Sequence, residues 1–158
     1  MFRSSILLIS AACVVLTGCG KAEKKAAGKP AEKAIYMSTG DCADDGKLNA
    51  DACAVLIDRA VKTHEATAAT YQSLLSCEKA SGIDRCEKGI SGAYRMRLQA
   101  FMFEISAAAS SAKPLYPSAG GAIGFRDAAK AAVEVTTDGL TVTQAALSAA
   151  HDNAKMKK

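Results

Sequence analysis

The stretch from residue 42 to residue 86 reads CADDGKLNADACAVLIDRAVKTHEATAATYQSLLSCEKASGIDRC, with a cysteine at each end and two more inside. Cys42 and Cys53 have ten residues between them, and Cys77 and Cys86 have eight. Paired zinc ligands usually have roughly two to four residues between them, and redox cysteines usually form a Cys-x-x-Cys motif. Because neither spacing occurs in this stretch, we expect two structural disulfides rather than a metal or redox site.

Four cysteines allow three pairings. We favour the local one, Cys42 with Cys53 and Cys77 with Cys86, because each pair brackets an Asp-Gly or Ser-Gly turn. The alternative is a helical hairpin stitched twice, with Cys42 bonded to Cys86 and Cys53 to Cys77. Each short local loop would contribute roughly 3 kcal/mol on the loop-entropy model. That contribution matters here, because only 5% of the chain is aromatic and Trp is absent.

A helix is expected between the two cysteine pairs. Asn49 suits the N-cap position, and Asp51 places a negative charge in the first turn. Apolar and small side chains then follow helical spacing: Cys53, Leu56, Ile57, Ala60, Val61, His64, Ala68, Tyr71 and Leu75. We expect this helix to end by Ser81-Gly82, with a break at Thr67 to Thr70, where β-branched residues flank alanines.

A second helical pattern follows, with apolar residues at Ile90, Tyr94, Leu98, Phe101, Met102 and Ile105. A core so poor in large side chains would not absorb this stripe, so we expect part of it to remain exposed and to contact a partner. Tyr94, Phe101 and Ile105 are the predicted contact residues.

The last third of the chain has mixed signals. The segment from Pro114 to Gly121 has the composition of a loop, and Asp138-Gly139 between two β-rich runs predicts a hairpin of residues 133–137 and 140–143. Residues 143–155 are expected to form an Ala-rich helix. The predicted fold is therefore mainly α: a small disulfide-stabilised helical domain over residues 35–112, then a loop-rich part over residues 113–158.

The N-terminus has the features of an export signal. A positive start at Arg3 precedes an apolar run from Ile6 to Leu16, which as a helix would cover roughly 17 Å of a ~30 Å bilayer core. This run is too short to span a membrane and fits a signal peptide over residues 1–18. The sequence Leu16-Thr17-Gly18-Cys19 resembles the bacterial lipobox, which implies cleavage before Cys19 and acylation of this cysteine.

Lipidation would fix both partner and location. Acyl chains on Cys19 would bind membrane lipid, and two or more such anchors hold a protein durably. Gly20 instead of Asp after the anchor favours the outer membrane, with the protein facing the periplasm, where disulfides form. Residues 19–34, which consist mainly of Lys, Ala, Glu and Gly, are expected to form a flexible tether.

The sequence supports no enzyme class, metal or cofactor. The net charge of +4 is modest and has no dense basic face with aromatics, so nucleic acid is not an expected partner. His64 lies on the apolar stripe and is expected to be a core histidine, since its neighbour Glu65 points about 100° away on a helix. Arg95 and Arg97 are expected on a solvated helix face. No Gly-x-Ser-x-Gly elbow occurs, and Gly120 to Gly124 has no preceding strand that would favour a nucleotide site.

Several motifs together resemble the YgiB-like lipoproteins of the bacterial envelope. These are Asp41-Cys42, the spacing to Cys53, the segment Glu65 to Tyr71, the Cys77–Cys86 spacing, and Pro114-Leu-Tyr with the later Gly124-Phe-Arg. The family tends to carry Pro where this chain has Ala69. The resemblance implies location and disulfides but no catalytic residue, because the family has no known function. It is sometimes encoded beside an ATP-grasp enzyme resembling glutathionylspermidine synthase.

Two functional hypotheses follow. The first is a non-catalytic lipoprotein that binds another envelope protein or a cell-wall component. The second, which rests only on the gene neighbour implied by the resemblance, is an accessory protein or enzyme subunit acting on cell-wall or polyamine-thiol metabolites. A deep pocket with convergent polar groups would favour the second hypothesis, and a shallow apolar groove would favour the first.

Overall fold

The computed structural model describes residues 30–156, of which 35% are helical and 27% lie in strands. The prediction of a mainly α fold is therefore wrong: the chain is an α+β domain. Four helices are present in the described part: α1 Thr39–Asp44, α2 Ala50–Thr67, α3 Leu74–Ser81 and α4 Gln144–Lys155. The strands are β1 Glu32–Tyr36, β2 Thr70–Tyr71, β3 Cys86–Lys88, β4 Tyr94–Met96, β5 Ala100–Ile105, β6 Ser110–Pro117, β7 Phe125–Arg126, β8 Ala132–Val133 and β9 Leu140–Val142.

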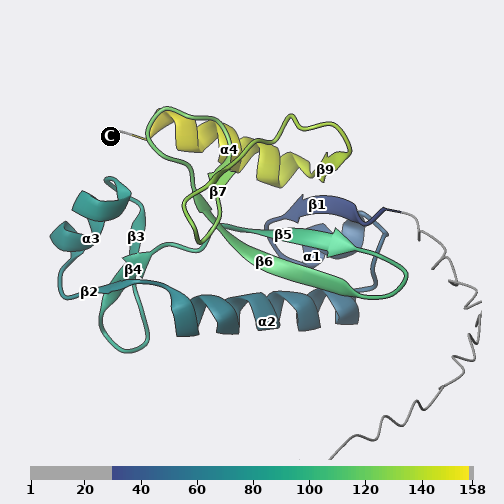
Figure 1. Ribbon diagram of the computed structural model, residues 1–158, viewed down its shortest axis with the longest axis horizontal. Helices are drawn as coiled ribbons and strands as arrows, with labels where there is room; N and C mark the ends of the chain where they lie inside the picture. Colours follow the sequence, from purple (N-terminus) through teal and green to yellow (C-terminus); the bar gives the residue numbers. More distant parts are fainter. Residues whose placement is uncertain (1–29, 157–158) are drawn as a thin grey trace, which may run out of the picture.

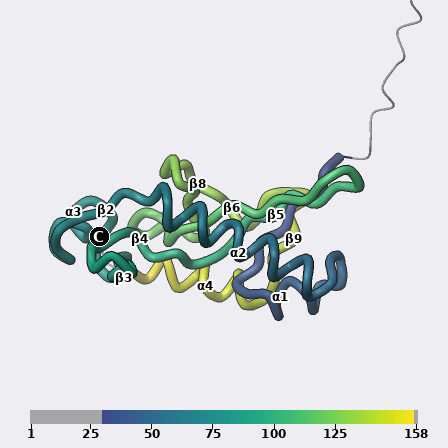
Figure 2. Tube along the Cα trace, turned by 90° about the horizontal axis from the view of Figure 1, so that it is seen from below, coloured from purple at the N-terminus to yellow at the C-terminus, as the bar shows by residue number. Residues whose placement is uncertain are grey.

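The strands form two sheets. The larger one has the order β8-β7-β6-β5-β1-β9, in which all neighbours are antiparallel except β1 and β9. The smaller one has the order β2-β4-β3 and is antiparallel. Figure 1 shows α2 along one face of the larger sheet and α4 along the other, with α3 and the small sheet at one end. Figure 2 shows the same arrangement from the side of α2.

Successive side chains of a strand point to opposite faces of the sheet, and the larger sheet has an apolar core on each face. In β1, Ala34 and Tyr36 face α2, whereas Ile35 faces α4. The core beneath α2 consists of Ala34, Tyr36, Cys42, Cys53, Leu56, Ala60, Phe101 and Phe103. Tyr36 and Phe103 meet edge to face with their ring centroids 4.9 Å apart. The core beneath α4 consists of Ile35, Ala100, Leu115, Phe125, Val135, Ala146 and Ala150.

Both disulfides have the favoured local pairing. Cys42–Cys53 joins α1 to α2, and Cys77–Cys86 joins α3 to β3. The first is part of the apolar core beneath α2, whereas the second closes the turn between α3 and the small sheet. The crossed alternative, a stitched helical hairpin, does not occur.

Helix starts were predicted better than helix extents. Asn49 caps α2 by accepting from the N–H of Ala52, and Thr143 caps α4, so both predicted starts are confirmed. The expected break after Thr67 is also present, but β2 and a separate helix, α3, follow it. The predicted helix through residues 90–105 is wrong, because this segment forms β4 and β5. Residues 101, 103 and 105 lie on the same face of β5. Hydrogen-bonded pairing with β1 and β6 favours the strand over the helix in this segment.

The C-terminal predictions were wrong in two places. The supposed loop from Pro114 starts inside β6, where a proline is tolerated because β7 pairs with β6 only at residues 116 and 117. The turn at Asp138-Gly139 exists, since the Leu140 N–H donates to the Thr137 carbonyl. Its two arms do not form a hairpin, however, because β8 pairs with β7, and β9 pairs in parallel with β1.

The predicted segment boundaries also shift. β1 begins at Glu32, within the segment expected to be tether, and the boundary expected between residues 112 and 113 falls inside β6. Residues 1–18 and Cys19 lie outside the described part of the chain, so the predicted signal peptide and anchor stay predictions. Within residues 30–156, no helix combines the length and the hydropathy required to cross a bilayer.

Candidate functional site

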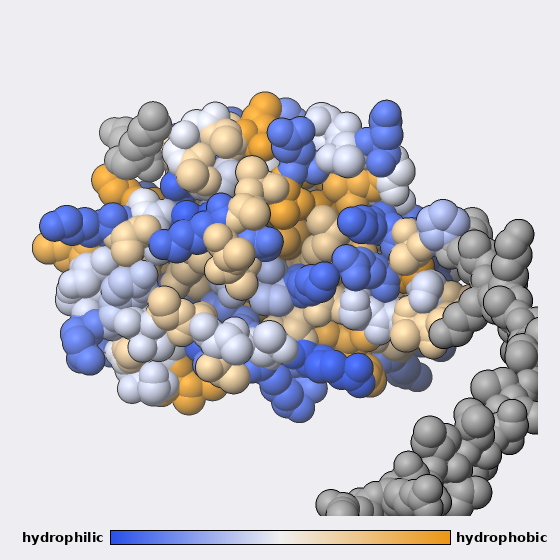
Figure 3. Space-filling view, in the orientation of Figure 1, coloured by the Kyte–Doolittle hydropathy of each residue, from blue (hydrophilic) through white to orange (hydrophobic). Residues whose placement is uncertain are grey.

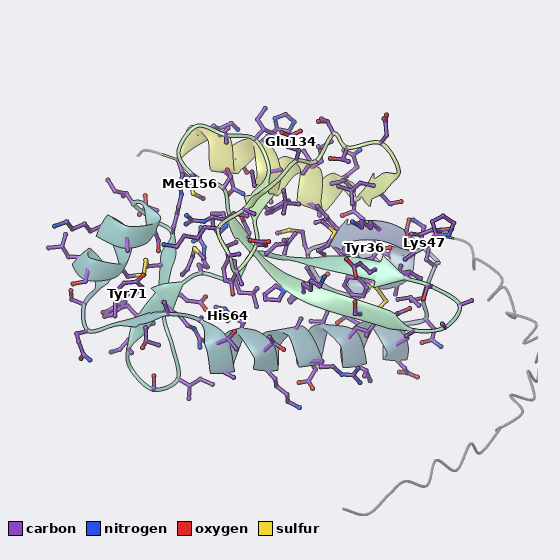
Figure 4. The ribbon with its side chains drawn as sticks, viewed as in Figure 1. Tyr36, Lys47, His64, Tyr71, Glu134 and Met156 are labelled. Atoms are coloured by element: carbon purple, nitrogen blue, oxygen red, sulfur yellow. A yellow bond between two sulfur atoms is a disulfide. The ribbon has the colours of Figure 1, made fainter. Side chains whose placement is uncertain are left out.

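A cavity of about 150 Å³ lies where the end of α2, the small sheet and the larger sheet meet. Five of the residues that line it come from different elements, and Ala68 and Lys130 add loop positions; the five are Thr67 of α2, Tyr71 of β2, Ser81 of α3, Met96 of β4 and Tyr116 of β6. Figure 4 shows His64 near the end of α2 and Tyr71 at the small sheet, on the same side of the molecule. The cavity therefore sits at the joint between the two halves of the fold.

His64 does not line the cavity itself but contacts Tyr116, which does. The imidazole is buried, its Nδ1 lies 2.9 Å from the Tyr116 hydroxyl oxygen, and its Nε2 lies 3.3 Å from Glu87 Oε1. Burial lowers the pKa of His64 below 6.5, against the opposing effect of Glu87, and therefore favours the neutral ring. Since a carboxylate only accepts, we assign the proton to Nε2, which donates to Glu87, and let Nδ1 accept from the Tyr116 hydroxyl.

Arg95 continues the network from β4. Its guanidinium donates through Nη1 to Glu65 Oε2 at 2.7 Å and through Nη2 to the other oxygen of Glu65. Its Nε donates to Glu87 Oε1 at 3.3 Å. This fork-to-fork pairing lowers the pKa of Glu65 and raises that of Arg95.

The connected groups run from Tyr116 through His64, Glu87 and Arg95 to Glu65. They come from β6, α2, β3 and β4, so the network ties the small sheet to α2 and the larger sheet. Both carboxylates are engaged by Arg95, and burial raises the pKa of Tyr116, so its hydroxyl stays protonated. Such a set is suited to holding and orienting groups, since it offers neither a free carboxylate base nor an activated nucleophile.

A second polar cluster is linked to the cavity through Ser81, one of the residues that line it. Arg85 and Arg126 are 2% and 6% exposed, and both donate to the carbonyl oxygen of Ser81, at 3.5 Å and 2.8 Å. In contrast to Arg95, neither has a carboxylate within 4.0 Å among residues 30–156. Arg126 pairs across the strands with Tyr116, so the two clusters are adjacent on one face of the larger sheet.

The predicted contact residues do not form one surface. Phe101 is buried in the core beneath α2, and Ile105 packs on the same core. Tyr94 belongs to the small sheet and is partly buried. The helical stripe that motivated this prediction does not exist, because these residues are in two strands of different sheets.

The sequence analysis identified only part of the polar site. His64 is in the core as expected, but with two side-chain partners instead of one. Arg95, expected on a solvated helix face, is buried in β4. Glu87 and Arg126 were missed because their partners His64 and Ser81 lie 23 and 45 residues away along the chain. Arg85 was missed too, although its partner Ser81 lies only four residues earlier. Cys19 remains outside the described residues.

Fold and site together define a small α+β domain with two disulfides and a cavity at the joint of its sheets. Residues 30–158 match the model of the family described as "Protein of unknown function (DUF1190)", so the chain belongs to that family. This agrees with the resemblance to the YgiB-like proteins at the level of the family. No curated protein and no solved structure matches the chain.

Proposed function

We propose that this protein is a non-catalytic lipoprotein of the bacterial envelope that binds a small ligand in the cavity at the joint of its sheets. The single observation that carries the proposal is the cavity itself, which is lined by residues of five elements and mostly by apolar or small side chains, with Tyr116 as its link to the polar network. Rigid walls and groups held by second contacts are typical of ligand sites. The export signal and lipobox support the location, on the outer membrane and facing the periplasm.

The experiment combines native mass spectrometry with a variant that fills the cavity. Processed protein extracted from membranes in mild detergent is expected to carry a small molecule and an acylated Cys19. Ala68→Phe fills the cavity and should remove the small molecule. Ala66→Phe, at an exposed position two residues earlier on α2, should retain it. An equal ligand content in both variants would refute binding in this cavity, and an unacylated product would refute the anchor.

A second candidate function is contact with another envelope protein through the end formed by α3 and the small sheet. Four large apolar residues are exposed there, with exposed fractions of 42% for Leu74, 76% for Leu75, 45% for Ile83 and 92% for Ile90. Figure 3 shows apolar residues among hydrophilic ones at this end, and β1 starts at the opposite end (Figure 1). A tether on β1 would therefore present the apolar end away from the membrane, toward a protein or cell-wall component.

This candidate has its own test. Photo-crosslinking from position 75 in intact cells should capture an envelope protein, and Leu75→Glu should abolish capture from position 83. Crosslinking that persists unchanged in Leu75→Glu would exclude this surface.

A further inference from the structure

Arg85 and Arg126 are unusual because they are buried cations that have no carboxylate partner among residues 30–156. Arg85 Nε, Arg85 Nη2 and Arg126 Nε are buried and have no hydrogen-bond acceptor in the described part of the chain. Buried charges are normally paired, and an unpaired buried guanidinium destabilises the fold. Arg85 also repels Arg126, which lowers the pKa of Arg126 further than burial alone. The two side chains therefore form a site whose charge is not balanced by a carboxylate within the described part of the chain.

The backbone around Arg85 is built to hold it in this place. The Cys77–Cys86 disulfide closes a ring that contains Ser81, Gly82 and Arg85. Gly82 has a φ of 103°, and a Cβ at this position would lie 2.6 Å from Arg85 Nη1. The absence of a side chain there leaves the space that the guanidinium occupies.

Arg126 is connected to the cavity in two ways. It donates to Ser81, which lines the cavity, and it lies opposite Tyr116, which lines it too. Arg126 itself lines a neighbouring cavity, also of about 150 Å³, and Lys130 lines both. Two guanidinium groups therefore meet at Ser81, Lys130 lines the cavity with Ser81, and Glu134 lines the neighbouring cavity with Arg126 and Lys130. The acidic neighbours Glu78 and Asp84 make no ion pair with them within the described residues.

We propose that Arg126, which lines the neighbouring cavity, and Arg85, which shares the Ser81 carbonyl with it, bind an oxyanion, a carboxylate or phosphate group of a small ligand, beside Ser81. This inference rests on the proposed ligand-binding function and names the chemical class of the ligand. Guanidinium groups match the two oxygens of carboxylate and phosphate, and a charge-assisted pair in a buried site is strong. A cavity of this size limits the ligand to a molecule about as large as benzene.

The first test is calorimetric titration of the processed protein in detergent with inorganic phosphate and with acetate, at constant ionic strength. We expect saturable binding of at least one anion. Arg126→Met and Arg85→Met should weaken it at least about tenfold, because each removes charged hydrogen bonds. Arg59→Met, which removes an exposed arginine from α2, should leave it unchanged. Binding of phosphate alone or acetate alone identifies the group, and unchanged binding in Arg126→Met, or saturable binding of neither anion, overturns the proposal.

A second measurement needs no variant. Proton–nitrogen NMR of the wild-type arginine side chains should show the Nε–H signals of Arg85 and Arg126 moving with the saturation curve of the anion. Saturable binding that moves only other arginines would place the anion elsewhere and overturn the assignment. Capture of a neutral molecule in the cavity, with no anion binding, would leave the proposed function intact and remove this inference alone.

Discussion

The larger sheet and the small-sheet end, which consists of α3, β2, β3 and β4, bury different kinds of side chain. Each face of the larger sheet has an apolar cluster, beside which His64 of α2 and Asn153 of α4 are buried polar residues. The small-sheet end buries Arg85 and Arg95, and Arg126 of β7 reaches across to it at Ser81. This end also carries Leu75 and Ile90 on its surface, 76% and 92% exposed.

The difference separates stability from binding within one small domain. Burial of apolar area is the main favourable term in folding, so the larger sheet with α2 and α4 supplies most of the stability. A buried cation without a partner destabilises the fold unless an anion binds it. Exposed apolar side chains mark a surface that another molecule can cover. The two disulfides fall on either side of this division, because Cys42–Cys53 lies in the apolar core and Cys77–Cys86 closes the ring that holds Arg85.

The largest expected effect compares an apolar side chain from each region. Phe103 is fully buried beneath α2, so Phe103→Ala should lower the free energy of unfolding by about 3–5 kcal/mol. Leu75→Ala should change it by no more than about 0.5 kcal/mol, because Leu75 is largely solvated. Urea unfolding followed by circular dichroism measures both. A loss for Leu75→Ala as large as that for Phe103→Ala would mean that the small-sheet end also carries the stability.

The disulfides sharpen the comparison, because equal losses of stability should have unequal consequences for binding. The two bridges span 11 and 9 residues, so replacing either pair of cysteines by serine should cost about 3 kcal/mol of unfolding free energy. Only the loss of Cys77–Cys86 should weaken binding of phosphate or acetate. Titration of both double variants at a temperature where each is folded checks this. Equal weakening by both would show that binding depends on general stability instead of on the ring.

Local signals in the sequence predicted local structure well. Asn49 and Thr143 are N-caps whose side chains accept from the N–H three residues later, and such signals need no tertiary information. The local disulfides were favoured for a similar reason, since each closes a short turn. The family was also identified from short motifs.

Local signals of this kind could not predict strand pairing or side-chain contacts between residues that are far apart in the sequence. Phe101 and Ile105 fit a helical stripe, yet Phe101, Phe103 and Ile105 equally fit a strand. The choice depends on β1, about 70 residues earlier, and on β6. The polar site could not be predicted for the same reason: His64 contacts Tyr116, which is 52 positions away in the sequence, and Arg126 contacts Ser81, which is 45 positions away. A buried arginine without a carboxylate has no sequence signature at all.

Removal of a guanidinium that is paired with carboxylates and removal of one that is not should change the free energy of unfolding in different directions. Arg95→Met removes three charged hydrogen bonds to Glu65 and Glu87, whose side chains are about one-third exposed and can be rehydrated. We expect a loss of about 2 kcal/mol in unfolding free energy. Arg126→Met removes an unpaired buried charge, and in anion-free buffer it should leave stability unchanged or raise it by about 1 kcal/mol. A loss in Arg126→Met equal to that in Arg95→Met would mean that Arg126 has a partner in solution.

The smallest effect concerns pH and the network that joins the two regions. Because burial lowers the pKa of His64 in the folded protein, the unfolded chain takes up this proton first as the pH falls. The contribution of His64 is therefore complete above the unfolded pKa of about 6.5 and declines below it, down to the lowered folded pKa. The lowered pKa of Glu65 acts in a separate pH range: its contribution to stability is present above the ordinary pKa of a glutamate and is lost only at lower pH.

His64→Gln should remove the decline in stability between pH 7 and pH 5.5, whereas His151→Gln, at an exposed position on α4, should retain it. Urea unfolding at several pH values measures the slope, and an unchanged slope in His64→Gln would mean that this histidine is charged, or solvated, in the folded protein.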